Sequence, residues 1–163
     1  MDAKRVIELL DLTPHPEEGG FFRETYRSPA SFEPGGPFSG QRSCGTAIYY
    51  LLTPDTWSAM HRLPGDEIFH FYAGDPVRML MLDPDGSHRT VMLGSTLGEA
   101  TPQHVVPGGV WQGARLVEGG SWALLGTTMS PGFEYADYET GSAALLSEYP
   151  EAAEAIRRLL PAT

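Results

Sequence analysis

The residues best suited to acid–base chemistry lie close together in the middle of the chain. His61 and Leu63 are two positions apart, Glu67 follows, and Gln112 comes after a proline- and glycine-rich turn. On a strand, His61 and Leu63 point to the same face, and a turn at 64–65 brings Glu67 back beside them. An imidazole next to a buried carboxylate can move a proton at a carbon adjacent to a carbonyl. We therefore predict His61 and Glu67 as catalytic residues and Gln112 as a substrate-orienting amide; the alternative is that His61 and Glu67 only satisfy one another inside a barrel.

The same positions are a poor set of metal ligands. They offer one imidazole, one carboxylate and one neutral amide oxygen, and Leu63 has no donor atom. A tight transition-metal site uses at least three good ligands. His70 would add a donor, but strand alternation places it on the opposite face from Glu67 unless a bulge intervenes. We therefore favour no cofactor, and the alternative is a divalent metal held by His61, Glu67, Gln112 and His70.

Arginine and aromatic side chains near these motifs are further candidates for substrate binding. A guanidinium can grip an anionic group with two parallel hydrogen bonds. A tyrosine hydroxyl can supply a second proton or bind an enolate oxygen, and a tryptophan can stack on a sugar or nucleobase or simply fill the core. On these grounds we predict substrate-binding roles for Arg23, Tyr50, Tyr72, Trp111 and Arg115.

Composition excludes several classes of function. The net charge of −10 argues against a protein that binds the phosphate backbone of nucleic acids. Lys4 is the only lysine and lies in an expected surface helix, which argues against Schiff-base chemistry, and Cys44 is the only cysteine, which excludes an intramolecular disulfide. No apolar run is long enough to span a membrane, and the N-terminus does not resemble a signal peptide. We expect a cytoplasmic protein with a small-molecule partner and no nucleic-acid or membrane partner.

Glycine and proline divide the chain into short segments typical of an all-β protein. The chain contains 19 glycines and 14 prolines, which cluster between runs rich in aromatic, valine, threonine and leucine residues. Helical spacing is present only at the two ends, after Asp2 and over about 148–160. This pattern predicts one barrel or sandwich domain over residues 1–163, with a core at about 18–140. The predicted strands lie near 20–28, 45–53, 56–63, 66–73, 76–83, 88–93, 103–107, 110–117, 120–130 and 132–138.

Two motifs resemble those of the cupin superfamily. From His61 to Gly74 the spacing H-x-L-x3-E-x6-G resembles the first cupin motif, with Leu63 in place of its second histidine. Residues 107–112, PGGVWQ, resemble the second motif, with Gln112 in place of its histidine. The blocks at 15–26, 46–52, 66–74 and 131–135 are similar to the DUF985, or cupin-5, family. The resemblance implies a double-stranded β-helix, a jelly-roll-like barrel, with short terminal helices. It also implies a homodimer and a structural similarity to sugar-nucleotide epimerases and seed storage cupins.

Neither the motifs nor the resemblance fixes an activity, so three hypotheses follow. The favoured one is an isomerase or epimerase-like enzyme that uses His61 and Glu67 on a small polar, sugar- or nucleotide-derived substrate. The first alternative is a non-catalytic cupin that binds a small molecule, because Leu63 and Gln112 stand where metal donors would be needed. The second alternative is a metal-dependent lyase, hydrolase or oxygenase.

Overall fold

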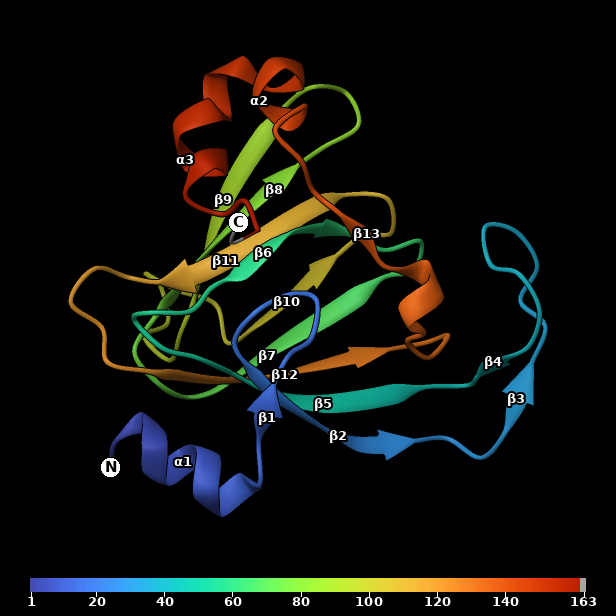
Figure 1. Ribbon diagram of the computed structural model, residues 1–163, viewed down its shortest axis with the longest axis horizontal. Coiled ribbons are helices and arrows are strands. Elements are labelled where there is room, and N and C mark those ends of the chain that lie inside the picture. Colours follow the sequence, from blue (N-terminus) through green and yellow to red (C-terminus); the bar gives the residue numbers. More distant parts are fainter. Residues whose placement is uncertain (162–163) are drawn as a thin grey trace.

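Two antiparallel β-sheets face each other and enclose the main core (Figure 1). The computed structural model describes residues 1–161. One sheet has six strands in the order β1 (Thr13–Pro14), β2 (Phe21–Arg27), β5 (Thr46–Leu52), β12 (Ala123–Met129), β7 (Glu67–Gly74) and β10 (Gln103–Val106). The other has five, in the order β13 (Glu139–Thr140), β6 (Ser58–Arg62), β11 (Trp111–Leu116), β8 (Val77–Leu82) and β9 (His88–Leu93). A separate hairpin pairs β3 (Ser31–Phe32) with β4 (Arg42–Ser43). The predicted all-β class is confirmed.

Alternating side chains on the strands build the core between the sheets. Val77, Met79 and Met81 of β8 point inward and are fully buried. They meet Leu125 and other inward residues of the six-stranded sheet. Because successive side chains on a strand point to opposite faces, this arrangement also sends Leu80 outward. On the outward face of β8, Leu80 and Leu82 pack against the C-terminal helices, while Arg78 is exposed.

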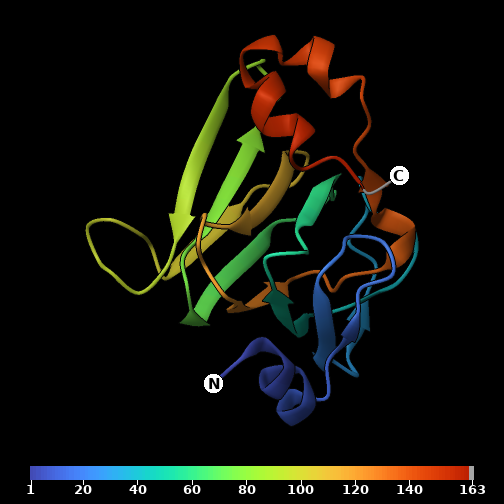
Figure 2. The same cartoon turned by 60° about the vertical axis from the view of Figure 1, so that its left-hand side comes forward.

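Short helices pack against part of the outer face of each sheet (Figure 2). Helix α1 (Ala3–Leu10) begins at Asp2, whose carboxylate accepts a hydrogen bond from the Arg5 amide at 2.9 Å, and it packs on the six-stranded sheet. The single helix predicted over about 148–160 is wrong. The structure has α2 (Leu145–Glu148), the 3₁₀ turn η2 (Pro150–Ala152) and α3 (Ala153–Arg157). Pro150 has no amide hydrogen to continue α2, so the chain turns there.

The strand predicted over 132–138 is also wrong. Residues 131–140, here called the closing segment, contain the 3₁₀ turn η1 (Tyr135–Asp137) and only the two-residue strand β13. Side-chain ion pairs hold this segment in place of a long backbone ladder. They join Arg27 to Glu134 at 3.0 Å, Arg42 to Asp137 at 2.8 Å and Arg62 to Glu139 at 2.7 Å. The other predicted strands are all present, within a few residues of their expected ends.

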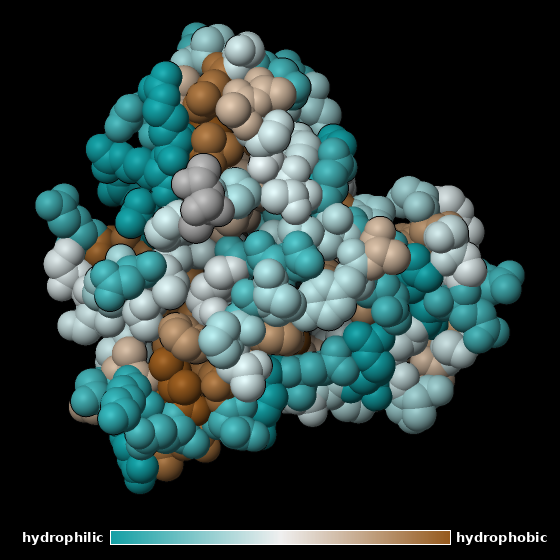
Figure 3. Space-filling model, viewed as in Figure 1, coloured by the Kyte–Doolittle hydropathy of each residue, from teal (hydrophilic) through white to brown (hydrophobic). Residues whose placement is uncertain are grey.

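The outer surface is mostly hydrophilic on the face that Figure 3 shows, with apolar residues gathered near α1 and at the C-terminal helices. Both apolar regions coincide with clusters in which helices pack against a sheet. Among residues 1–161, no helix has the length and apolar character that a membrane crossing requires.

Candidate functional site

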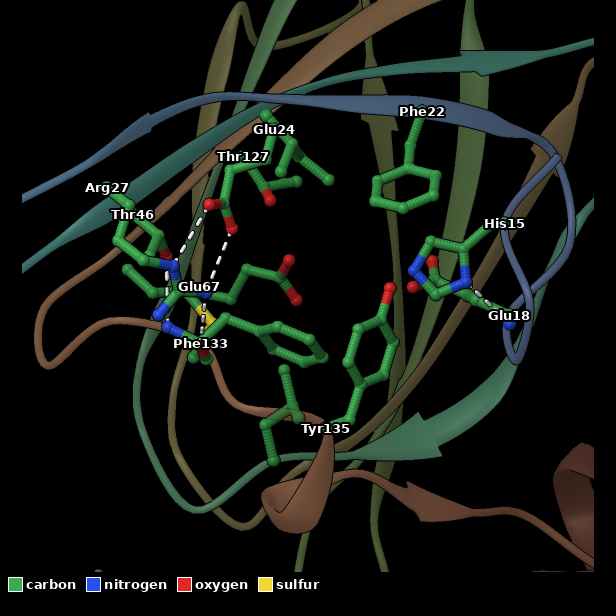
Figure 4. A pocket seen from close by; sticks show the side chains of 13 residues that line it. His15, Glu18, Phe22, Glu24, Arg27, Thr46, Glu67, Thr127, Phe133 and Tyr135 are labelled. Carbon is green, nitrogen blue, oxygen red and sulfur yellow. Dashed lines mark hydrogen bonds and ion pairs between the residues drawn. The ribbon is translucent and has the colours of Figure 1, made fainter. Parts of the chain in front are cut away.

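A cavity of about 60 Å³ opens between the sheets, beside the closing segment (Figure 4). Its apolar wall comes from Phe22, Ile48, Leu63, Met129 and Phe133, which lie on β2, β5, the β6–β7 turn, β12 and the closing segment. The other eight lining residues are polar or charged, and their side chains converge on the same space. They are His15, Glu18, Glu67 and Tyr135, with Thr46, Thr127 and the Glu24–Arg27 pair at the edges. A concave pocket in which apolar walls meet converging polar groups is the usual form of a small-molecule site.

His61 lies behind this wall and is 1% exposed. Its Nδ1 is 2.7 Å from the carbonyl oxygen of Ala59, which can only accept, so Nδ1 carries a hydrogen. Its Nε2 is 3.9 Å from a carboxylate oxygen of Glu18 and 3.9 Å from one of Glu67. Burial disfavours the imidazolium, but the charges of Glu18 and Glu67 outweigh burial and raise the pKa of His61 to about 9. At neutral pH, His61 is therefore a buried cation shared by two carboxylates.

Gln112 holds the second of these carboxylates in position. It is paired with His61 in the β6–β11 register, and its Nε2 donates to Glu67 Oε2 at 2.8 Å. The predicted turn at 64–65 brings Glu67, the first residue of β7, back beside His61. The predicted trio of His61, Glu67 and Gln112 is thus assembled at one place, although only Glu67 of the three lines the cavity. The Gln112 Oε1 atom is buried and has no hydrogen-bond partner in the described chain.

The sequence did not single out Glu18 or His15 as a site residue. Glu18 faces His61 and accepts a hydrogen bond from the Ser58 hydroxyl, while its backbone oxygen accepts from the Ala59 amide at 2.9 Å. His15 Nδ1 accepts a hydrogen bond from the backbone amide of Glu18 at 2.9 Å, so the ring stabilises the turn that follows it. The other ring nitrogen carries the hydrogen and faces the cavity, and burial lowers the pKa of His15 (Figure 4). The only available signal was the run HPEEGG at 15–20, which carries the family resemblance but no chemical motif.

The closing segment supplies the aromatic part of the site. Phe133 and Tyr135 line the cavity and meet edge to face, with ring centroids 5.0 Å apart. Tyr138 stacks on the His61 ring at 5.0 Å, and burial raises the pKa of its phenol. The Tyr138 hydroxyl is buried without a hydrogen-bond partner in the described chain. Because Arg27 is held by Glu24 and Glu134, its charge at the cavity edge is already neutralised.

Two of the predicted substrate-binding residues lie outside the barrel. Arg23 and Tyr72 are on the outer face of the six-stranded sheet, because Phe22 and Glu67 occupy the inward positions of β2 and β7. The Arg23 guanidinium lies 5.7 Å from the ring centroid of Tyr49. Tyr72 is 51% exposed and stacks on His70. Neither side chain reaches the cavity.

The other three are also away from the cavity. Tyr50 points inward but is buried in the core, where its hydroxyl donates to the Gly19 carbonyl at 2.8 Å and supports the loop that carries Glu18. Trp111 packs with the C-terminal helices, because it is on the outward face of β11, next to the inward Gln112. Arg115 is on that outward face as well and lines a separate groove.

The residues of the cavity do not fit a transition-metal site. His70 is on the outer face, as alternation requires, and its Nε2 is 2.9 Å from the Thr128 hydroxyl. Gln112 turns its amide nitrogen toward Glu67, so a ligand oxygen is not offered there. Within residues 1–161, no three His, Cys, Asp or Glu side chains are arranged to hold a metal ion. The metal set of His61, Glu67, Gln112 and His70 is therefore not assembled.

Comparison with known proteins identifies the family. A family model described as "Cupin superfamily (DUF985)" matches residues 4–141. The chain belongs to this cupin family. It is 33% identical over 134 residues to an uncharacterized protein of Saccharomyces cerevisiae, a match that spans 74% of this chain but only 66% of the yeast protein.

Solved structures support the same assignment. A protein from Shewanella oneidensis is 34% identical, with a TM-score of 0.89 over 100% of this chain and 99% of that one. A hypothetical protein from Leishmania major is 30% identical, with a TM-score of 0.90 over 99% of this chain and 100% of that one. A dTDP sugar isomerase from Desulfovibrio desulfuricans, at 19% identity and a TM-score of 0.53 over 78% of this chain and 86% of that one, shares the fold alone. Oxalate decarboxylase from Bacillus subtilis also shares only the fold, at 14% identity.

Proposed function

We propose that this cupin is an isomerase or epimerase-like enzyme that transfers a proton on a small polar substrate in the cavity. The observation that carries the proposal is the arrangement of Glu18, His61 and Glu67. A buried imidazolium stands 3.9 Å from each of two carboxylates, and both carboxylates line the cavity. Titratable groups whose surroundings strongly shift a pKa, placed at a cavity, are typical of acid–base sites.

Glu67 is the group that touches the substrate as a base. Its carboxylate reaches the cavity, whereas His61 is enclosed behind it. His61 Nε2 lies 3.9 Å from the Glu67 carboxylate, and the amide of Gln112 donates to that carboxylate and orients it. Glu67 takes the proton from a carbon next to a carbonyl, and the N–H of His15 that faces the cavity stabilises the resulting enolate oxygen (Figure 4). Return of the proton to the same carbon in the other configuration completes an epimerisation. Return to the former carbonyl carbon completes an isomerisation, when the hydroxyl proton on the first carbon moves to the former carbonyl oxygen and a carbonyl forms at the first carbon.

The size and walls of the cavity indicate the substrate class. A volume of about 60 Å³ admits only the reacting end of a molecule. Aromatic rings such as Phe22, Phe133 and Tyr135 suit the apolar face of a sugar-like ring, while the carboxylates accept its hydroxyl hydrogens. The presence of a dTDP sugar isomerase among proteins of the same fold is consistent with this class.

Solvent deuterium exchange into a panel of small carbonyl compounds and sugars tests the proposal. The protein is incubated in D₂O with dihydroxyacetone, glyceraldehyde, ribulose and a dTDP-hexose, and NMR records deuterium at carbon. We expect exchange on at least one probe, reduced about 10²–10⁴-fold by Glu67→Gln. Glu99→Gln, which makes the same change at an exposed loop position, is the matched control. Exchange that survives Glu67→Gln overturns the assignment.

One observation favours a second candidate, a cupin that binds a small molecule without changing it. Leu63 lines the cavity where a donor would be needed for a metal, and most of the wall is apolar. Saturable binding of one of the probes with no deuterium exchange would support this candidate and contradict the enzyme.

A further inference from the structure

A second and larger groove lies on the outer side of the five-stranded sheet. Its volume is about 970 Å³, and it runs between β8, β9 and β11 and the C-terminal helices. These elements lie together in Figures 1 and 2. The groove shares no lining residue with the cavity between the sheets. It is therefore a separate candidate site.

Two arginines face each other across neighbouring strands in this groove. Arg78 of β8 is the register partner of Arg115 of β11, and both line the groove. Directly opposite residues in an antiparallel pair have Cβ atoms about 5 Å apart, and like charges there are unfavourable. Within residues 1–161, neither guanidinium has a carboxylate within ion-pair distance, although the chain has 21 acidic residues. The fold therefore places two arginines at paired strand positions with no ion-pair partner among the described residues, in a groove that Glu118, Glu151 and Glu154 also line.

Arg115 is also held in a fixed orientation. Its Nη1 donates to the backbone carbonyl of Arg158 at 3.2 Å, and its guanidinium carbon is 5.8 Å from the ring centroid of Trp57. Among the described residues, only one of its five N–H donors takes part in a hydrogen bond. An oriented guanidinium with free donors recognises tetrahedral oxyanions such as phosphate by parallel hydrogen bonds.

We propose that this groove binds a phosphorylated small molecule, with its phosphate between Arg78 and Arg115. The volume is within the range of sites for nucleotides and similar ligands. Thr90 lies on the adjacent strand, and Glu118, Glu151 and Glu154 also line the groove, where they can accept hydrogen bonds from ligand hydroxyl groups. The site is independent of the proton-transfer chemistry proposed for the cavity.

Titration with pyrophosphate at low ionic strength tests the site. Isothermal calorimetry gives the affinity, and NMR follows the indole N–H of Trp57, which is next to Arg115, and of Trp122, which packs against the other sheet. We expect saturable binding that shifts the Trp57 signal and not the Trp122 signal. Arg78→Ala and Arg115→Lys are each expected to weaken binding at least about tenfold. Arg78 is exposed, so its replacement does not threaten the fold.

Arg23→Ala is the matched control, because Arg23 also lacks a carboxylate partner in the described chain but lies on the other sheet. It is expected to leave pyrophosphate affinity unchanged, and so is Glu67→Gln. Absence of saturable binding, or equal weakening by Arg23→Ala, overturns the proposal. Equal affinity for citrate also contradicts it, because the site would then recognise any polyanion. The proposals for the cavity and for the groove can be refuted independently, because Glu67 and Arg78 are tested with different ligands.

Discussion

His61 keeps its charge because two carboxylates face the same ring nitrogen, and this makes folding and protonation interdependent. The folded pKa of about 9 is above the ordinary value of 6.5, so the folded state binds the proton more tightly than the unfolded chain. The resulting stabilisation is complete below pH 6.5 and is lost as the pH rises through 9. It amounts to on the order of 3 kcal/mol. We expect the free energy of unfolding in urea to fall by about this amount between these pH values.

His61→Gln separates this effect from other pH-dependent groups. The variant is less stable at pH 6.5 but has lost the titrating group, so its unfolding free energy should change much less toward pH 9. A variant with the same pH slope as the native chain would show that His61 is not the group responsible.

At the scale of single residues, the spacing in the sequence predicted part of the candidate site. His61, Glu67 and Gln112 were identifiable because one turn and one strand register determine their meeting. Glu18 was not, because it is distant in sequence from Glu67 and reaches His61 only when the loop after β1 folds over β6. Arg115 was misplaced, although alternation along β11 from the inward Gln112 already puts a residue three positions later on the outward face.

At the scale of elements, the turn in the first cupin motif is hydrogen-bonded to the turn in the second. The backbone amide of Gly108 donates to the Asp66 carboxylate at 2.8 Å, and that of Gly109 donates to the Leu63 carbonyl at 2.8 Å. A Cβ atom on Gly108 would overlap the carbonyl oxygen of Pro64. This contact explains, in physical terms, why a glycine stands at that position of the second motif.

Gly108→Ala is therefore expected to destabilise the fold by about 1–3 kcal/mol, because a backbone oxygen cannot move aside cheaply. The measurement is urea unfolding followed by tryptophan fluorescence. Gly36→Ala is the control, since a Cβ atom there meets nothing within 4 Å. If both variants unfold at the same urea concentration, the two turns are not packed as described.

The type of an element was predictable where the local sequence signals agree. The prediction failed where tertiary contacts determine the backbone conformation. Strands bounded by strong turns, such as β8 and β9 around Gly86, were found. The closing segment has the aromatic alternation of a strand, with Phe133 and Tyr135, but ion pairs to distant arginines fix it as a turn. Those partners are known only once the sheets are assembled.

At the scale of the whole molecule, the five-stranded sheet separates the two candidate sites, which lie on its inner and outer faces. The polar site lies between the two sheets, and the arginine groove lies outside the five-stranded sheet. The outer face of the six-stranded sheet is different, because α1 covers only one end of it. Its open part carries Tyr26, Tyr72 and Val105, which are 55%, 51% and 44% exposed. Strand β10 is the edge of that sheet.

This open face is suited to pairing with a second copy of the chain. Exposed apolar side chains gathered on one face are typical of interaction surfaces. The register places Val105 beside Ile68 and Tyr26 beside Ala47 on this outer face, which in β2, β5, β7, β10 and β12 presents no carboxylate. Two copies with a net charge of −10 each can therefore approach here with little direct repulsion.

We expect a homodimer at micromolar concentration, measured by size-exclusion chromatography with light scattering. Val105→Glu and Tyr72→Glu should each give monomers, because each buries a carboxylate against its own copy across the two-fold axis. Leu97→Glu changes a residue that is 77% exposed in a loop outside this face, and it should remain dimeric. A native chain that is monomeric, or a Leu97→Glu variant that dissociates as readily, would show that this face does not pair.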